Sequence, residues 1–300
     1  MVCTLSSYKL LKIPKGKVIA MVLHDHCNFA CEYCAIPLDK KKDTSQLVKY
    51  SDGSYIDRFV SYGSDNVFVL SGGEPTLTPR FVQFIEKITE NNRISMYTNL
   101  STDVNWLRRY ADKIDYIMAA LSPYYDNESH FEKFADKVKI LYENGVNIFV
   151  RFIATKARIP LIDKYIKYFK HIDVPFLVYP EFKYSAGLYQ VEYYTENEFM
   201  KIFTHANYVG KLYMEHNGVK GNCLKCLAGS KYIYIDQTWG IYKCVNFTAD
   251  ANVNCDTCCT CDIQYFYGMT GLTQVPIWDR TDTGYLRWIK KNKLDSKWWI

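Results

Sequence analysis

Three cysteines near the start of the chain, Cys27, Cys31 and Cys34, have a spacing that suits metal chemistry. Gaps of three and two residues allow a tight loop to aim three thiolates at one centre. Three thiolates can hold a cubane 4Fe-4S cluster and leave one iron free of protein. Structural zinc would need a fourth ligand, which His24 or His26 could provide, so a zinc site stays open as the alternative.

A second candidate site follows a short apolar run, where Gly72 and Gly73 precede Glu74 and Pro75. Two glycines at the end of a strand let the backbone approach a ligand closely, because no Cβ atom is in the way. An adjacent carboxylate can accept hydrogen bonds from an ammonium group. Without the cysteines, such a pair of glycines would indicate only a turn.

Together the two motifs resemble those of the radical S-adenosylmethionine (radical SAM) superfamily, which carries Cys-x3-Cys-x2-Cys and Gly-Gly-Glu-Pro. The resemblance implies an enzyme with SAM and a 4Fe-4S cluster, in which Cys27, Cys31 and Cys34 are the ligands and the catalytic residues. One electron from the reduced cluster would cleave SAM to methionine and a 5′-deoxyadenosyl radical, which abstracts hydrogen from a substrate. An electron donor such as flavodoxin or ferredoxin is also implied. By position, the resemblance places the SAM contacts at Tyr33, Gly72, Gly73, Glu74, Thr98, Asn99, Ser122 and Arg151.

The resemblance assigns roles to several of these residues. Glu74 would accept from the methionine amine, and Thr98 and Asn99 would meet the ribose. The backbone of Tyr33 would lie near adenine, and Arg151 would take the methionine carboxylate. Arg151 stands in an otherwise apolar strand, where a buried cation needs an anion, so a structural ion pair is the alternative for this residue.

A second group of cysteines lies in the last third of the chain: Cys223, Cys226, Cys244, Cys255, Cys258, Cys259 and Cys261. The segment from Cys226 to Cys244 is typical of a β-hairpin and resembles the opening of the SPASM and twitch auxiliary-cluster domains. This resemblance implies one auxiliary 4Fe-4S cluster, and a second is open. The expected ligands are Cys226, Cys244, Cys255 and Cys258, with Cys223, Cys259 and Cys261 as replacements or as ligands of the second cluster. A zinc ribbon, built from Cys223 with Cys226 and from Cys255 with Cys258, is the alternative.

The elements that must position these residues alternate between short apolar runs and segments of helical period, which predicts an α/β fold with a parallel sheet. The expected strands are 18–23, 67–70, 94–98, 116–121, 147–154 and 174–179. The expected helices are 45–61, 80–91, 104–112, 128–143 and 160–169. An open sheet and an incomplete barrel both place working groups at the carboxyl ends of the strands. The resemblance implies a partial (β/α)6 barrel with a small Cys-rich C-terminal auxiliary domain.

The expected domains are the barrel over 1–194, an auxiliary domain over 195–268 that opens with a helix over 195–208, and a tail over 269–300. The tail is rich in Trp and Lys, and we expect it to pack on the core, with a nucleic-acid contact as the alternative. The basic run from Lys40 to Lys42 is expected to be a solvated loop.

Composition narrows the classes of protein. The chain has 300 residues, 48% hydrophobic and 23% charged, which is typical of a globular protein and excludes disorder. No apolar run is long enough for a membrane helix and the start lacks a signal peptide, so we expect a cytoplasmic protein with no membrane partner. Eleven cysteines without a secretory signal argue against a disulfide framework. The net charge of +5 permits a polyanionic partner but does not require one.

The fold does not select the substrate. We expect a nucleotide, a modified base or another small molecule, with nucleic acid open as a partner. A peptide, as in the RiPP maturases, is the alternative. It is placed second because only 26 residues precede Cys27, and a leader-binding domain would need more. The alternative of another class is a non-enzymatic iron-sulfur or zinc module that binds nucleic acid.

Overall fold

The computed structural model describes residues 14–185, 188–191, 194–195, 197–198, 201–202 and 231–242. Three predicted features lie outside these residues. They are most of the helix over 195–208, the tail over 269–300 and all seven cysteines of the second group.

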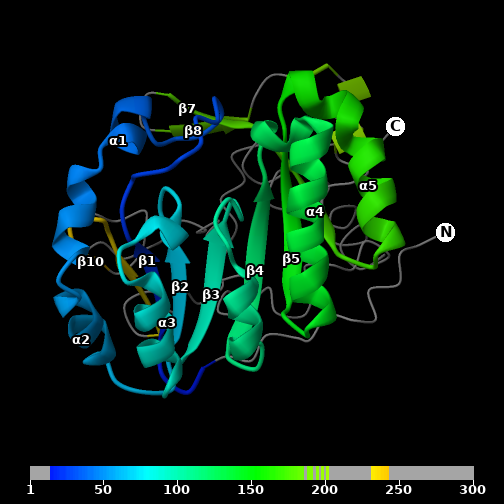
Figure 1. Ribbon diagram of the computed structural model, residues 1–300. Coiled ribbons are helices and arrows are strands. Elements are labelled where there is room, and N and C mark those ends of the chain that lie inside the picture. Colours follow the sequence, from blue (N-terminus) through cyan, green and yellow to red (C-terminus); the bar gives the residue numbers. More distant parts are fainter. Residues whose placement is uncertain are drawn as a thin grey trace, which may run out of the picture.

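An eight-stranded sheet with the order β10-β9-β1-β2-β3-β4-β5-β6 forms the centre of the protein (Figure 1). All neighbouring strands run parallel except β10, which is antiparallel to β9. The first six strands are β1 (Val18–Val22), β2 (Val67–Ser71), β3 (Arg93–Thr98), β4 (Ile114–Leu121), β5 (Ile148–Ala154) and β6 (Phe176–Pro180). They confirm the six predicted strands, and the mostly parallel sheet is typical of a partial barrel.

Helices connect the successive strands. The α-helices are α1 (Leu38–Lys42), α2 (Ser54–Val60), α3 (Phe81–Thr89), α4 (Glu128–Glu143) and α5 (Ile162–His171). Short 3₁₀ helices are η1 (Ser45–Tyr50), η2 (Pro75–Leu77), η3 (Asn105–Tyr110), η4 (Pro123–Asp126) and η5 (Lys156–Leu161). A two-stranded antiparallel sheet of β7 (Phe182–Ser185) and β8 (Leu188–Val191) follows β6.

Helix α4 has the predicted bounds, and the side chain of Asn127 caps it by accepting from the backbone N–H groups of Ser129 and His130. Other helices differ from the prediction. The helix expected over 45–61 is divided into η1 and α2 at Gly53, whose φ of 83° interrupts the helix. The segment expected over 104–112 forms only the 3₁₀ helix η3. Helix α5 begins at Ile162, because Pro160 belongs to the preceding 3₁₀ turn.

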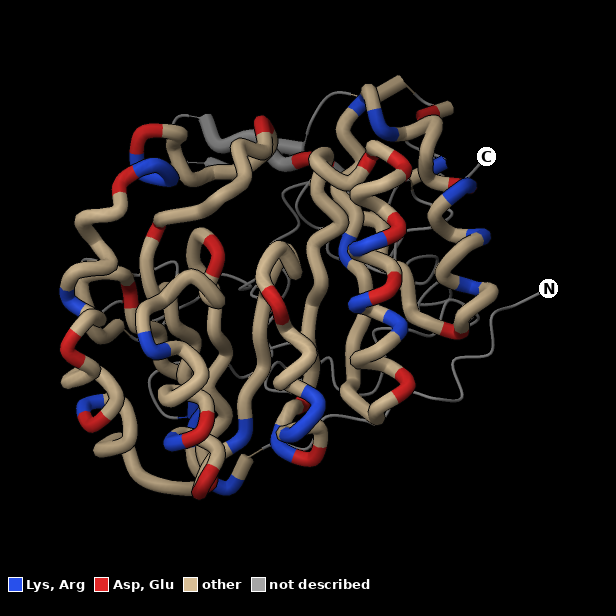
Figure 2. The backbone as a smooth tube through the Cα atoms, viewed as in Figure 1, with Lys and Arg blue, Asp and Glu red and all other residues tan. Residues whose placement is uncertain are grey.

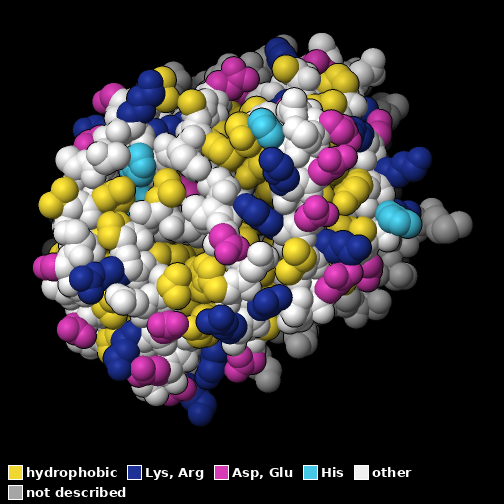
Figure 3. Space-filling view, in the orientation of Figure 1, with side chains coloured by type: hydrophobic (Ala, Val, Ile, Leu, Met, Phe, Trp, Pro, Cys, Tyr) yellow, Lys and Arg dark blue, Asp and Glu magenta, His cyan; other side chains and the backbone are white. Residues whose placement is uncertain are grey.

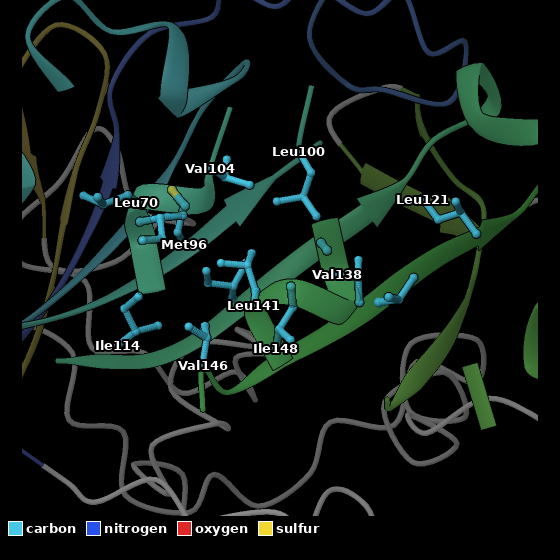
Figure 4. Packing of buried hydrophobic residues seen from close by; sticks show 14 of the residues in the cluster. Leu70, Met96, Leu100, Val104, Ile114, Leu121, Val138, Leu141, Val146 and Ile148 are labelled. Carbon is cyan, nitrogen blue, oxygen red and sulfur yellow. The ribbon is translucent and has the colours of Figure 1, made fainter. Parts of the chain in front are cut away.

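Two apolar clusters occupy the two faces of the sheet. The outer cluster lies between strands and helices; Figure 4 shows Val138 and Leu141 of α4 beside Ile148 of β5. The inner cluster, on the other face, is Val18, Ala20, Val67, Val69, Tyr116, Met118, Phe149, Ile153, Leu177, Tyr179 and Tyr232. Because side chains alternate along each strand, every second residue joins the other cluster.

The predicted hairpin between the cysteines of the second group is confirmed in its described strands. Strand β9 (Tyr232–Ile235) pairs parallel with β1, and β10 (Ile241–Tyr242) returns antiparallel to β9. Trp239, in the turn, donates from its indole Nε1 to the hydroxyl of Tyr50 at 3.2 Å. The hairpin therefore extends the main sheet beside β1.

Charged residues lie mainly on the helices and loops, while β2, β3 and β4 are uncharged over most of their length (Figure 2). Within the described part of the chain, no helix combines the length and apolar character needed to cross a bilayer. The prediction of a solvated loop over Lys40 to Lys42 is wrong in structure, because all three residues lie in α1, and wrong in solvation for Lys41, which is only 4% exposed.

Candidate iron-sulfur and SAM site

The loop that follows β1 carries Cys27, Cys31 and Cys34, and all three thiols are half-buried and free of disulfides. The backbone N–H of Cys34 donates to the carbonyl of Cys31 at 3.2 Å, which closes a tight turn around the last two cysteines. Burial raises the pKa of Cys27 to about 11 and also raises the pKa of Cys31. These two thiols therefore stay protonated until a cationic centre displaces their protons.

The segment with Gly72 and Gly73 is docked directly on the loop after β1. The backbone N–H of Gly73 donates to the carbonyl of His24 at 2.7 Å, and that of Glu74 donates to the carbonyl of His26 at 2.9 Å. A Cβ on Gly73 would lie 2.0 Å from the His26 oxygen, and one on Gly72 would lie 2.4 Å from the His24 oxygen. The two glycines therefore permit the contact between the two motifs, a reason that differs from the close ligand approach inferred from sequence.

His24 connects the same two segments through its side chain. It is fully buried, with Nδ1 3.1 Å from the carbonyl oxygen of His26 and Nε2 3.0 Å from Oγ1 of Thr78. Burial, followed by the charge of His26, lowers the pKa of His24 to about 4, so the ring is neutral at pH 7. Both ring nitrogens are engaged within the protein, which argues against His24 as a fourth zinc ligand.

A cluster and a single ion place different demands on the donor set. Within the described ranges, no three His, Cys, Asp or Glu side chains are placed to hold one metal ion. A cubane has a different requirement, because each thiolate binds its own iron and the sulfurs need not meet at one point. The triad could therefore serve a cluster without its three sulfurs converging on one point.

Glu74 is fully buried, and its carboxylate joins the end of β3 to the Gly-Gly segment. It accepts from the hydroxyl of Thr98 at 2.7 Å, from the backbone N–H of Asn99 at 2.6 Å and from the hydroxyl and N–H of Thr76. Burial raises the pKa of Glu74, and these hydrogen bonds oppose the rise. Among the ion pairs of the described residues, none gives this carboxylate a cation.

Asn99 reaches the cysteine loop from the end of β3. Its side-chain Nδ2 lies 3.1 Å from Oδ1 of Asn28 and 3.8 Å from Sγ of Cys27. The hydroxyl of Tyr125 donates to the backbone carbonyl oxygen of Asn99 at 2.7 Å. Asn99, which is expected at the ribose, thus also contacts Cys27. The segments at the ends of β1, β2 and β3 therefore form one hydrogen-bonded unit.

Several buried polar atoms in this region make no hydrogen bond. They are Nδ1 of His26, Oγ of Ser122 and Oγ1 of Thr155, which follow β1, β4 and β5, and Nε of Arg151, which lies in the middle of β5. Leaving such atoms unpaired is costly, and a bound polar ligand would remove the cost. The polar groups at this edge therefore fit a ligand such as SAM.

Arg151 pairs in register with Ala120 of β4 and Leu177 of β6, and its guanidinium lies 5.0 Å from the ring centroid of Tyr179. The structural ion pair considered as its alternative role is not among the ion pairs of the described residues. Tyr33, from the cysteine loop, packs against the inner cluster.

Sequence reasoning missed Arg158, which is 3% exposed and joins the ends of β4 and β5. Its guanidinium donates to both carboxylate oxygens of Asp126 at 2.8 and 2.9 Å and to the carbonyls of Leu121 and Ile153. These bonds hold the backbone next to Ser122. No signal in the sequence distinguishes Arg158, because Asp126 and Leu121 lie more than 30 residues away along the chain.

Comparisons with known proteins relate the chain to one family and to several solved structures. The family model of the radical SAM superfamily matches residues 21–164. No curated protein matches the chain. Among solved structures, polyhistidine-tagged anSMEcpe with bound AdoMet has a TM-score of 0.51 and 14% identity, covering 86% of this chain and 82% of that chain. SuiB of Streptococcus suis bound to the precursor peptide SuiA has a TM-score of 0.54 and 14% identity, covering 91% of this chain and 66% of that chain.

At these identities of 14%, the solved structures show the fold alone. The matched residues include the cysteine triad, the Gly-Gly segment and the polar ends of β3, β4 and β5. The family match over residues 21–164 supports an enzyme of the radical SAM superfamily, dependent on a 4Fe-4S cluster and SAM.

Proposed function

We propose that Cys27, Cys31 and Cys34 ligate the 4Fe-4S cluster and that SAM binds beside it at the carboxyl ends of β2 to β5. The observation that carries this proposal is the hydrogen-bonded unit that joins the cysteine loop, Glu74 and the end of β3. When bound, the reduced cluster and SAM supply a 5′-deoxyadenosyl radical that abstracts hydrogen. The residues of the chain position these groups and exclude water.

Charge complementarity supports the orientation of SAM. The carboxylate of Glu74 is buried without a cationic partner among the described residues, so the methionine ammonium would stabilise it. Arg151 has an unpaired Nε and would take the methionine carboxylate. Ser122, 1% exposed with an Oγ that makes no hydrogen bond, would supply a further polar contact.

Reductive cleavage of SAM tests the assignment. With dithionite as reductant, the anaerobically reconstituted chain should form 5′-deoxyadenosine, and Cys27→Ala, Cys31→Ala and Cys34→Ala should each abolish it, because two thiolates do not hold the cluster. Cys3→Ala, outside both groups, is the control. Wild-type 5′-deoxyadenosine production by any one of the three variants would remove that cysteine from the ligand set.

For the substrate, we propose a nucleotide, a modified base or another small molecule. Beside the inner cluster lie the partly buried rings of Tyr33, Tyr97 and Tyr234, which keep some exposed surface. Aromatic side chains suit a planar ring, because bases stack on them without strict sequence preference.

A peptide is the second candidate. Two of the similar solved structures were determined with peptides, namely anSMEcpe with Cp18Cys and SuiB with SuiA. To separate the candidates, nucleosides, nucleotides and peptides are each incubated with the reduced enzyme and SAM, and 5′-deoxyadenosine above the substrate-free rate is measured. Stimulation by peptides alone would overturn the small-molecule proposal.

We also propose an auxiliary 4Fe-4S cluster held by Cys226, Cys244, Cys255 and Cys258, and reduction of the enzyme by a flavodoxin or ferredoxin. The described hairpin supports the cluster, because Lys231 and Tyr242, its two ends, stand five residues after Cys226 and two before Cys244. The backbone N–H of Val18 donates to the carbonyl of Lys231 at 2.8 Å, so the base of the hairpin lies at the amino end of β1.

A further inference from the structure

Lys41 is the one lysine or arginine of α1 that is removed from water. It is 4% exposed, whereas its neighbours Lys40 and Lys42 are exposed. Lysine side chains are seldom this buried unless their charge is paired, because transfer of an ammonium from water is costly. The burial of Lys41 therefore calls for a negatively charged partner.

The contacts of Lys41 lead to two of the three cysteines. Its side-chain Nζ donates to the carbonyl oxygen of Cys31 at 3.0 Å. Its own carbonyl oxygen accepts from the backbone N–H of Cys27 at 3.0 Å. A single residue on α1 therefore holds the cysteine loop at two points, one of them through a positive charge.

No carboxylate neutralises this charge in the described part of the chain, where none of the ion pairs includes Lys41. An ammonium has three N–H donors, and the hydrogen bond to Cys31 uses one. A carbonyl group is a dipole without net charge, so it compensates only part of the positive charge of Lys41.

We propose that Lys41 is a positioning residue that supplies the positive charge facing the 4Fe-4S cluster and makes the cluster easier to reduce. The proposal rests on the assignment of Cys27, Cys31 and Cys34 as ligands. Three thiolates give the cluster a net negative charge, and reduction adds one more negative charge. A nearby cation stabilises the reduced state more than the oxidised state and so raises the reduction potential.

The test is a redox titration of the reconstituted full chain, followed by the electron paramagnetic resonance signal that changes when SAM is added. Lys41→Gln removes the charge and retains a hydrogen-bond donor, while Lys41→Arg retains the charge. Lys42→Gln removes an exposed charge from the same helix and is the matched control. We expect Lys41→Gln to disfavour reduction about tenfold, a potential lower by about 59 mV for one electron, and Lys41→Arg and Lys42→Gln to stay near wild type.

Iron content and circular dichroism keep the result interpretable if a variant does not assemble its cluster. A folded Lys41→Gln chain without the N-terminal cluster, next to a loaded Lys41→Arg chain, also supports a role for the charge. An unchanged potential in Lys41→Gln, an equal shift in Lys42→Gln, or equal iron loss in Lys41→Gln and Lys41→Arg would overturn the proposal. Failure of the ligand assignment can be told apart from failure of the Lys41 proposal. In that case the wild-type chain itself would show no electron paramagnetic resonance signal that depends on Cys27, Cys31 and Cys34.

Discussion

At the scale of single residues, the site is organised by buried polar groups that have partners on other strands. Glu74 joins Thr98 and Asn99 to the Gly-Gly segment, and His24 joins the loop after β1 to Thr78. Each group loses hydration on burial, so its hydrogen bonds must compensate. Changes at these residues should therefore affect ligand binding and stability in separable ways.

Glu74→Ala should weaken SAM binding while cluster iron stays, because the carboxylate is proposed to contact the ligand rather than the metal. A hydrogen bond to a charged group contributes about 1.5 to 3 kcal/mol, so the SAM Kd should rise about tenfold or more. Equilibrium dialysis with SAM and iron analysis on the same sample measure both quantities. Glu132→Ala, at an exposed position on α4, is the control. Loss of iron with unchanged SAM affinity would instead make Glu74 a residue of the cluster loop.

His24 should make the fold sensitive to acid. Its pKa is about 4 in the folded chain and 6.5 for an unperturbed histidine, so between these pH values the unfolded chain binds a proton that the folded chain does not. Stability is therefore lost as pH falls from 6.5 to about 4, by up to about 3 kcal/mol. Thermal unfolding followed by circular dichroism at several pH values should show a shallower pH dependence in His24→Gln. His171→Gln, at an exposed position, should behave as wild type; equal slopes in all three proteins would contradict this role for His24.

At the scale of elements, the site depends on how the segments after neighbouring strands pack on one another. The backbone after β2 touches the backbone after β1, with the N–H of Gly73 donating to the carbonyl of His24 at 2.7 Å. Farther along the sheet, Arg158 joins the segments after β4 and β5. The carboxyl edge of the sheet is thus connected across several crossovers.

Gly73→Ala should disrupt this edge, because its Cβ would lie 2.0 Å from the carbonyl oxygen of His26. Overpacking against backbone typically costs about 1 to 3 kcal/mol, and the backbone shift needed to relieve it would displace the loop of Cys27. We expect a lower free energy of unfolding and reduced iron incorporation. Gly145→Ala is the control, since a Cβ there meets open space and only its φ of 80° is unfavourable. Wild-type iron content in Gly73→Ala would show that the close contact is dispensable.

At the scale of the entire protein, the described hairpin joins the C-terminal part of the chain to the barrel. Strand β9 pairs with β1, and Trp239 packs against Tyr50 of η1. Because β9 belongs to the main sheet, the proposed auxiliary cluster would be connected to the barrel through the sheet.

On the face shown in Figure 3, positive and negative side chains are interspersed, which gives that face no basic field of the kind expected for a nucleic-acid surface.

Replacing both Cys226 and Cys244 by Ala should remove about four irons per chain while the N-terminal cluster still cleaves SAM, because separate sites lose their ligands separately. Turnover of substrate should then fail, whichever role the auxiliary cluster has. Iron analysis, the SAM-cleavage assay and substrate turnover are measured on one preparation. Stoichiometric zinc in the anaerobically purified wild-type chain, with iron for one cubane only, would replace the auxiliary cluster with a zinc ribbon.

The amino-acid sequence determined the order of the elements and the chemistry of the site. Apolar runs predicted β1 to β6, and local capping by Asn127 gave α4 its predicted bounds. The cysteine triad and the Gly-Gly-Glu-Pro motif indicated the superfamily, because short-range spacing is sufficient to specify these two motifs. The helix over 45–61 was predicted less well, since a positive φ at Gly53 divides it.

Only the tertiary structure decided which residues meet. The burial of Lys41, the contact of Gly73 with His26 and the bonds of Arg158 depend on segments brought together by the sheet. Charge and local pattern predicted Lys41 to be solvated, because the preference of lysine for water dominates until a specific partner compensates it. Such partners come from distant segments, as with Leu121 and Arg158, and no local pattern encodes them.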